Sequence, residues 1–418
     1  MLVRRALLSL AVSANADDRE APPRPPAGEA ATAGTVLRVI RDAGALTRAE
    51  IARQTGLARS TVAQRVDTLL RHELVYEVGN NDSTGGRPAA ALAFNDRSGV
   101  VLCADLGVTH SRLAVCDLGG ARLAEVVEDL DISAGPDEVL SVVDRLFASL
   151  LTDAGRTAAQ VRGIGIGVPG PVAFDRGEPT NPPIMPGWDG FSIPDWFASR
   201  YTAEVLVDND VNIMALGEHW THWRDRGHLL FVKVGTGIGC GIVAKGRIHR
   251  GAKGAAGDIG HIRLADHEEV CRCGNVGCLE AVAGGGALAR RLSEQGIEAE
   301  TSRDVVRLVK GGDRTATQLV REAGRDLGEV LAGCVNFFNP EVIVIGGDVG
   351  QASQQLLAGV RETIFQRSLP LATEELRVVP SQLEDGAGVV GAAIMAIERV
   401  LAPEAIDHAI RRGVNPAT

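Results

Sequence analysis

Residues 257–280 read GDIGHIRLADHEEVCRCGNVGCLE, and this stretch indicates the fold more strongly than any other. It places four metal ligands within eighteen residues, namely His261, Cys271, Cys273 and Cys278. Tetrahedral Zn²⁺ takes Cys₃His sets of this kind in structural sites. The alternative, a run of core cysteines beside a chance histidine, fits poorly because the glycines next to these cysteines favour tight loops rather than interiors. The spacing therefore predicts one structural zinc ion held by a loop.

The same stretch carries a family resemblance. Its motif C-x-C-G-x-x-G-C-x-E follows G-x-x-G-[ED]-x-G-H, and together they resemble the signature of the ROK family of repressors, open reading frames and sugar kinases. Further landmarks of that family follow in the same order from about residue 100 to about residue 400. The resemblance implies an α/β body of two actin/hexokinase-like (RNase-H-like) lobes around a cleft.

Length and charge fit a protein of several domains. A chain of 418 residues, 45% of them apolar, has material for roughly two to four packed domains. The net charge of −10 excludes a basic protein that coats nucleic acid, so any DNA-binding surface must be confined to one part. The cysteines outside the zinc motif stand singly in apolar surroundings, as expected for buried thiols in a reducing cytoplasm: Cys103, Cys116, Cys240 and Cys334.

The first 33 residues are expected to form a disordered tail. Their start, MLVRRALLSLAVSANA, is similar to a signal peptide, but its apolar run of about nine residues is too short to span a membrane. The following APPRPPAGEAATAG is rich in proline and alanine. An upstream start-site artefact is the alternative. Because thiol ligands and a DNA-binding module follow, we expect a cytoplasmic protein without a membrane anchor.

Residues 34–95 are predicted to form a winged helix-turn-helix. Thr47 and Glu50 form a capping box before a helix that stops at Gly56. The next helix, ARSTVAQRVDTLLRHE, turns apolar residues to the core at helical spacing, and LVYEVG and AAALAF bracket NNDSTGGRP as a wing. Eight arginines against six acids between residues 34 and 88 make the module locally basic. The candidate DNA contacts are Arg59, Ser60, Thr61, Gln64, Arg65 and Arg87.

This module resembles the winged helix-turn-helix of ROK repressors, which implies operator DNA as a partner. A reader of a two-fold site implies at least a dimer, so we expect a homodimer or homotetramer. A helical cap that binds another protein is the alternative. The module departs from the family pattern at Ala58, where a serine or threonine often caps the helix.

Three glycine-rich segments resemble the nucleotide loops of the family's sugar kinases. The first lies at residues 105–109, where those kinases have D-x-G-G-T; the second is GTGIGCG (235–241), and the third ends the strand VIVIGGD (342–348). Backbone amides of such loops cradle phosphates. The sequence has no G-x-x-x-x-G-K-[ST], which excludes P-loop chemistry. If Mg-ATP binds, the resemblance implies contacts from Asp105, Gly107, Thr109, Gly235, Thr236, Gly237, Gly239, Gly346 and Gly347.

A carbohydrate pocket is implied between these loops. The family's N-D-x-N element corresponds to residues 209–212, which makes Asp210 the candidate catalytic base of an active kinase. A helix cap is the alternative role for Asp210. The Pro-rich loop 181–190 presents Trp188, which is suited to covering the apolar face of a sugar. The resemblance implies a sugar site made of Asn209, Asp210, Asp258, His261 and Glu280, with His261 shared with zinc.

Two departures bear on catalysis. Val108 replaces the second glycine of D-x-G-G-T, where a β-branched residue resists positive φ and crowds a phosphate. Asp258 replaces a glutamate and is one methylene shorter. Three functions stay open: a sugar-responsive transcriptional regulator of carbohydrate-utilisation genes, an ATP-dependent hexose or N-acetylhexosamine kinase with a DNA-binding domain, and a zinc-dependent interaction protein. The winged module and both departures favour the regulator.

The expected domain order follows from these segments. A tail (1–33) precedes the winged module (34–95), and two α/β lobes occupy residues 98–215 and 216–402, with the zinc loop in the second. The last helix, near residues 386–400, is expected to pack back onto the first lobe. Residues 403–418 are expected to form a C-terminal tail.

Overall fold

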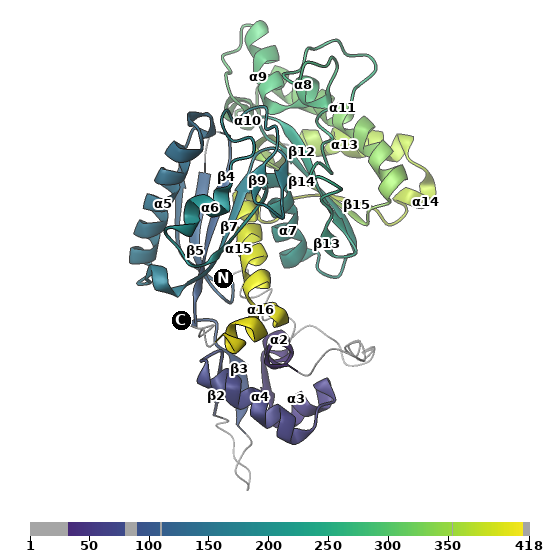
Figure 1. The fold of residues 1–418 in the computed structure, drawn as a ribbon. Coiled ribbons are helices and arrows are strands. Elements are labelled where there is room, and N and C mark those ends of the chain that lie inside the picture. Colours follow the sequence, from purple (N-terminus) through teal and green to yellow (C-terminus); the bar gives the residue numbers. More distant parts are fainter. Residues whose placement is uncertain (1–31, 80–89, 109–110, 353, 413–418) are drawn as a thin grey trace.

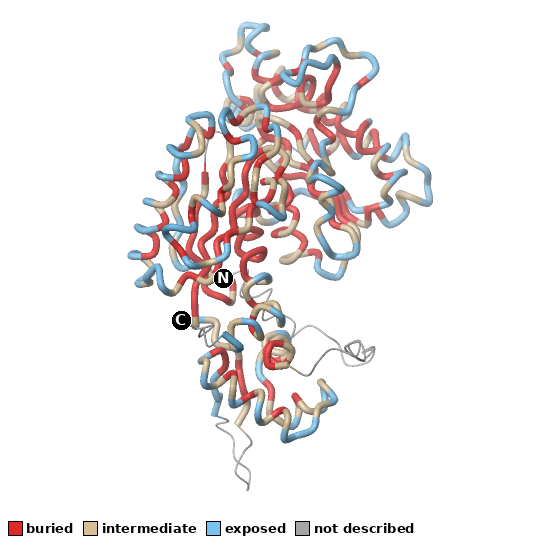
Figure 2. The backbone as a smooth tube through the Cα atoms, in the orientation of Figure 1, coloured by how far each residue is buried: buried red, intermediate tan, exposed pale blue. Residues whose placement is uncertain are grey.

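The computed structural model describes residues 32–79, 90–108, 111–352 and 354–412. Figure 1 shows a small N-terminal module below two α/β lobes that stand side by side. The buried segments run through the centre of both lobes and continue into the small module (Figure 2). The α/β architecture predicted from the sequence is confirmed.

The N-terminal module is a winged helix-turn-helix. It contains α2 (Ala33–Ala43), α3 (Arg48–Thr55), α4 (Arg59–Arg71) and an antiparallel sheet in the order β1 (Ala45–Thr47), β3 (Ala91–Phe94), β2 (Val75–Val78). The predicted capping box is present, because the Glu50 amide donates to Thr47 Oγ1 at 3.3 Å and the Thr47 amide donates to Glu50 at 2.8 Å. Ala58 caps α4 without a side-chain hydrogen bond. Strands β2 and β3 border the predicted wing, whose tip lies outside the described residues.

The first lobe is built on a five-stranded sheet in the order β10-β7-β4-β5-β6. The strands are β4 (Val100–Leu106), β5 (Ser111–Asp117), β6 (Arg122–Glu128), β7 (Val161–Val168) and β10 (Glu204–Asn209). β5 is antiparallel to both β4 and β6, whereas β7 is parallel to both β4 and β10. Helix α5 (Pro136–Asp153) packs on one face, and α7 (Asp210–His222) and α15 (Ala387–Val400) cover the other (Figure 1).

The second lobe repeats this topology. Its sheet has the order β13-β12-β11-β14-β15, from β11 (His228–Val234), β12 (Ile238–Ala244), β13 (Arg247–Ile248), β14 (Val342–Gly346) and β15 (Arg377–Pro380). The first three strands are antiparallel, and β14 and β15 run parallel to β11. Its helices are α8 (Leu279–Ala283), α9 (Gly285–Glu294), α10 (Ser302–Lys310), α11 (Arg314–Phe338), α12 (Asp348–Ala352), α13 (Gln354–Arg367) and α14 (Pro370–Thr373). Two lobes of one topology are the arrangement expected of the actin/hexokinase-like fold.

The chain returns to the first lobe and then to the N-terminal module. Helix α15 packs against α7, β4 and β7. Residues 403–418 were expected to form a tail, but Pro403–Arg411 form helix α16, which packs on α2 (Figure 1). The reason is its apolar face: Ile406 is buried in the core that the module shares with the first lobe. The expected N-terminal tail likewise ends earlier, because Thr32 caps α2.

Short elements complete the described chain. They are α6 (Ile193–Ala198), β8 (Val172–Ala173), β9 (Glu178–Pro179) and the 3₁₀ turns η2 (Ile132–Ala134), η3 (Ala158–Gln160) and η4 (Glu384–Gly386). Among the helices of the described ranges, none has the length and apolar character needed to cross a membrane.

Candidate functional site

One cleft between the lobes gathers most of the residues that the sequence singled out. The whole predicted sugar set lines it: Asn209, Asp210, Asp258, His261 and Glu280. So do most of the predicted nucleotide contacts: Asp105, Gly107, Gly235, Thr236, Gly237, Gly239 and Gly347. Gly346 does not line the cleft; its missing side chain leaves room for the Phe231 ring, which lies 2.5 Å from an ideal Cβ position. Thr109 lies outside the described residues.

Asn209 and Asp210 stand where β10 ends and α7 begins. Asn209 is the N-cap, and its Oδ1 accepts from the amides of Val211 and Asn212 at 2.9 and 3.2 Å. Its Nδ2 donates to Gly170 O and to Asp210 Oδ1, both at 3.0 Å. The cap role that was an alternative for Asp210 therefore belongs to Asn209. Asp210, the first residue of α7, presents its second oxygen to the cleft.

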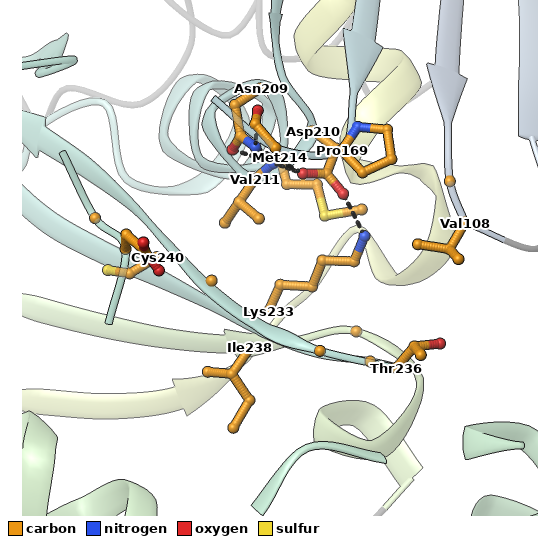
Figure 3. Close-up of a pocket in the computed structure, with 18 of the residues that line it drawn as sticks. Val108, Pro169, Asn209, Asp210, Val211, Met214, Lys233, Thr236, Ile238 and Cys240 are labelled. Atoms are coloured by element: carbon orange, nitrogen blue, oxygen red, sulfur yellow. Dashed lines mark hydrogen bonds and ion pairs between the residues drawn. The ribbon is translucent and has the colours of Figure 1, made fainter. Parts of the chain in front are cut away.

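The ammonium of Lys233 faces this second oxygen, and the sequence did not single Lys233 out. It comes from β11, and its Nζ lies 2.6 Å from Asp210 Oδ2 (Figure 3). Burial disfavours the ammonium, but the carboxylates of Asp210, Asp105 and Asp348 outweigh burial and raise the pKa of Lys233. A lysine near the end of a strand that is otherwise mostly apolar, just before a glycine-rich hairpin, was the available signal.

Asp105, at the end of β4, is the most perturbed acid of the cleft. Only 8% of the residue is exposed, and its Oδ1 has no hydrogen-bond partner among the described residues. Burial raises its pKa to about 7; the positive charges of Lys233 and Arg112 oppose this, and Asp210 reinforces it. Gly388 of α15 packs directly on it, since an ideal Cβ there would meet the Asp105 carboxylate.

A second feature that the sequence did not predict is an ion pair between Asp208 and Arg250. Asp208 is buried, and its Oδ2 binds the guanidinium of Arg250 at 2.6 and 2.8 Å. Asp208 Oδ1 accepts from Asn212 Nδ2 at 2.9 Å, which holds the first turn of α7. Arg250 also lies over the Phe174 ring, 3.6 Å from its centroid. This pair ties the loop after β13, which continues to Asp258, to the first lobe.

The remaining predicted sugar residues surround the zinc motif. The Asp258 carboxylate lies 2.7 Å from His261 Nδ1, so the shorter acid contacts the imidazole. Burial opposes the charged imidazole, but this contact with Asp258 and the charge of Glu280 raise the pKa of His261. Glu280, in α8, accepts from the Ile238 amide at 3.1 Å. Gly237 leaves space for it, because an ideal Cβ there would lie 2.1 Å from its carboxylate.

Three of the four predicted metal ligands lie together, because one ligand atom from each of His261, Cys271 and Cys273 lies within 4.8 Å of the others. Cys278 is outside that group, but its Sγ lies 3.7 Å from the Sγ of Cys273. Zn–S bonds of about 2.3 Å at tetrahedral angles separate sulfurs by about 3.8 Å, so this spacing fits. Because Asp258 holds Nδ1 of His261, Nε2 is left for a metal, the usual carboxylate–histidine–zinc arrangement.

Two further expectations meet different outcomes. Val108 lines the cleft (Figure 3), as Asp105 does, and it is not among the described non-glycine residues with positive φ. The prediction that Trp188 covers a sugar is wrong. Its side chain is fully buried in the first lobe, where Nε1 donates to Ile132 O at 3.1 Å. The apolar ring contributes more by packing in that core than it would in an open loop.

The predicted DNA-contacting residues follow the outer face of α4. Arg59, Ser60 and Gln64 are exposed, Thr61 and Arg65 are half-buried, and the opposite face buries Val62, Val66 and Leu69. Arg48, from the start of α3, pairs with Glu77 of β2 at 3.0 Å and so ties the wing to the helices. Arg87 lies outside the described residues.

The two parts of the chain match two different families of known proteins. Residues 101–399 match the ROK family, and residues 32–79 match the IclR helix-turn-helix domain. The xylose repressor of Caldicellulosiruptor bescii is 30% identical over 380 residues, which cover 88% of this chain and 95% of that protein.

Two solved structures extend the comparison. A ROK family transcriptional regulator, a homologue of the E. coli MLC protein, has a TM-score of 0.77 and 27% identity and covers 91% of this chain and 98% of its own. The ROK family glucokinase of Streptomyces griseus, in complex with glucose and AMPPNP, has a TM-score of 0.63 and 26% identity and covers 71% of this chain and 99% of its own. The regulator thus covers more of this chain than the kinase does.

Proposed function

This chain belongs to the ROK family, and from that premise we propose that it is a DNA-binding transcriptional regulator that responds to a carbohydrate. One observation carries the proposal: α15 joins the interlobe cleft to the winged helix-turn-helix. At its start, Gly388 packs on Asp105 in the cleft. At its end, Glu398 pairs with Arg41 of α2 at 3.0 Å, and α16 continues along α2.

Operator DNA is the proposed partner of α4. Arginines near the start of a recognition helix contact phosphates and base edges, and the serine, threonine and glutamine there add hydrogen bonds. The proposed contacts on the described part of the chain are Arg59, Ser60, Thr61, Gln64 and Arg65. Arg87 of the wing is proposed as a further contact from the sequence alone. Reading a two-fold operator needs a homodimer or homotetramer.

A carbohydrate is the proposed effector in the cleft. Carboxylates and an imidazole suit paired hydroxyls, because they accept hydrogen bonds that an apolar pocket cannot offer. Asp258, His261 and Glu280 come from the second lobe, whereas Asn209 and Asp210 come from the first. A sugar bound to both sets would favour the closed arrangement of the lobes, and it shifts that equilibrium only by its differential affinity.

Zinc is proposed as a structural ion of the effector cleft. His261, Cys271, Cys273 and Cys278 would hold it and stiffen the loop that carries Asp258. The support is the spacing of these ligands and the contact between Asp258 and His261.

Residual sugar kinase activity is the second candidate function. Asp210 favours it, because this carboxylate stands at a helix start in the cleft, where a base would meet a sugar hydroxyl. Mg-ATP would then bind at the glycine-rich loops. Val108 and Lys233 argue against turnover, since they occupy space and hydrogen-bonding capacity beside that base.

The test uses the full-length protein and two readouts. Duplexes selected from a random DNA library give an operator, whose footprint should cover two half-sites. A panel containing D-xylose, D-glucose and N-acetyl-D-glucosamine is then screened for a change in operator affinity and for thermal stabilisation, with and without Mg-ATP. Enrichment of no duplex would contradict DNA binding. ATP-dependent phosphorylation of a hexose that Asp210→Asn abolishes would promote the kinase.

A further inference from the structure

An ammonium stands among carboxylates at the centre of the cleft. Lys233 Nζ lies 2.6 Å from Asp210 Oδ2, with 22% of the lysine side chain and 6% of the aspartate side chain exposed. The negative charges of Asp105 and Asp348 also act on this ammonium. Figure 3 shows Lys233 reaching from β11 across the cleft toward Asp210, with Val108 on the other side.

These carboxylates are donors that a divalent cation prefers. Mg²⁺ binds through one or two carboxylates together with substrate phosphates. Asp105 is the last residue but one of β4, Asp210 begins α7 and Asp348 begins α12, and all three line the cleft together with the glycine-rich loops. Among the described residues these three carboxylates do not lie close enough together to form a metal group by themselves, but Mg²⁺ needs only one or two of them when it also binds phosphates. The group as a whole does not fit Mg-ATP, because the ammonium already bonds the Asp210 oxygen that faces the cleft.

We propose that the Lys233 ammonium takes the position of a divalent cation, so that this cleft holds its carbohydrate without Mg²⁺ or nucleotide. Burial raises the pKa of Asp105 to about 7, so this carboxyl is only partly ionised near neutral pH and the negative charge that the ammonium must balance is reduced. Oδ1 of Asp105, which has no partner in the described part of the chain, then remains as a hydrogen-bonding group.

The choice of lysine supports this role. The chain has only four lysines among 43 basic residues, and the other three, Lys245, Lys253 and Lys310, are exposed. An ammonium is a compact point charge with three donors, whereas a guanidinium is a wide planar fork. A position that needs a small cation against the Asp210 carboxylate, in the field of Asp105 and Asp348, therefore favours lysine.

Lys233 also determines what Asp210 can do. Asp210 Oδ1 accepts from Asn209 Nδ2 and from the Val211 amide, and Oδ2 accepts from Lys233. A general base needs a free lone pair within reach of the hydroxyl proton. Oδ2 has a second lone pair that can still accept from a sugar hydroxyl, but its ion pair with Lys233 competes with that proton for the same oxygen. Lys233 is thus a specificity-determining residue that favours binding over phosphoryl transfer.

The experiment measures metal binding directly, with Mn²⁺ as the probe. Zinc-replete full-length protein is titrated with Mn²⁺ at pH 7.5, and free Mn²⁺ is followed by electron paramagnetic resonance. Lys233→Met should bind about one Mn²⁺ per chain, at least tenfold more tightly than wild type, and adding Asp105→Asn should abolish the gain. Lys310→Met, an exposed lysine of the same lobe, should behave as wild type.

Two results would overturn the proposal. One is a folded Lys233→Met protein that gains no Mn²⁺ site; the other is a stoichiometric site in wild type that Asp105→Asn removes. If Lys233→Met does not fold, the wild-type protein supplies the test. Mg²⁺ with AMPPNP should leave the melting temperature of wild type unchanged, and a rise that Asp105→Asn abolishes would contradict the proposal.

The proposal rests on the carbohydrate cleft proposed above, but these experiments contain neither sugar nor DNA. Its failure therefore leaves the regulator function standing, and failure of operator binding leaves these results interpretable.

Discussion

Asp105 makes stability depend on pH at the scale of one residue. Its pKa rises from 3.8 to about 7 on folding because burial disfavours the carboxylate. The native state therefore holds this proton more tightly than the unfolded chain does. The resulting stability is complete below about pH 4 and is lost as the pH rises through about 7.

We predict that Asp105→Asn removes this dependence. Wild type should lose about 2–4 kcal/mol relative to the variant between pH 4.5 and 7.5, at about 1.4 kcal/mol per unit of pKa difference. Urea unfolding at several pH values measures the difference. Asp175→Asn, at an exposed turn, is the control and should run parallel to wild type. Parallel curves for Asp105→Asn would show that the carboxylate is ionised in the native state.

Cys273 gives a second prediction at this scale. Cys273→Ser should lower bound zinc from about one ion per chain toward zero and destabilise the protein, because metal binding is coupled to folding of the loop. Elemental analysis and thermal unfolding check this. Arg272→Ala, the exposed neighbour in the same loop, should keep its zinc. Well-folded wild type without zinc would refute the assignment.

Among the secondary-structure elements, helices α7 and α15 are in direct backbone contact. An ideal Cβ on Gly391 would lie 1.7 Å from Ile213 O, and one on Gly217 would lie 2.4 Å from Ala387 O. The buried Glu218 carboxylate also accepts from Ser381, Gln382 and Leu383, which lead into η4 and α15. The helix that begins at Asp210 is therefore rigidly joined to the helix that reaches the DNA-binding module.

We predict that Gly391→Ala destabilises the protein by about 3 kcal/mol or more, since an overpacked core can relax only by moving α7 from α15. Gly333→Ala is the matched control: this glycine lies in α11, and no atom of the described residues lies within 4 Å of its ideal Cβ. It should be neutral or stabilising by up to about 1 kcal/mol. Equal effects of the two changes in denaturant unfolding would contradict the tight contact.

The contrast between local and long-range signals explains what the sequence predicted. The Thr47–Glu50 capping box and the spacing of His261 with the cysteines are local, so both could be read directly. The Asp210–Lys233 contact joins residues that are 23 positions apart and lie on two lobes, so no periodic pattern in the sequence predicts it. Helix α16 was missed because its apolar face is buried mainly against α2, which lies at the opposite end of the chain. Trp188 was misplaced because its loop folds into the core.

DNA binding is a property of the whole molecule, because the module must attract phosphates although the chain as a whole carries a net charge of −10. Arg59→Ala should weaken operator binding, and loss of one phosphate contact should reduce the salt slope by about one unit. Fluorescence anisotropy over a range of salt concentrations measures both. Arg272→Ala, far along the chain in the zinc loop, is the control. An unchanged salt slope and affinity would remove Arg59 from the interface.

Effector recognition should be separable from operator recognition. Glu280→Ala should reduce the response to the carbohydrate at least tenfold while operator affinity stays within about twofold, because Glu280 lies in the cleft of the second lobe. Glu294→Ala, exposed in the neighbouring helix α9, should respond as wild type. If Glu280→Ala loses operator affinity while Glu294→Ala keeps it, the cleft contributes to operator binding even without the carbohydrate, and the two functions are not separable.

Coupling between the two sites is the property that defines a regulator, and it is reciprocal. If the carbohydrate changes operator affinity by some factor, the operator must change carbohydrate affinity by the same factor.

The contact between α16 and α2 is where a substitution should reduce this coupling. The Gly34 amide donates to Asp407 Oδ1 at 2.9 Å, and an ideal Cβ on Gly34 would lie 2.2 Å from Pro403 O. Gly34→Ala should therefore separate the helices and bring both factors toward one, while each ligand alone still binds. Isothermal titrations of carbohydrate with and without operator, and of operator with and without carbohydrate, give the two factors, with Gly333→Ala as the control. Full coupling in Gly34→Ala would show that the signal does not pass along α15 and α16, and would favour a change in the spacing of whole subunits instead.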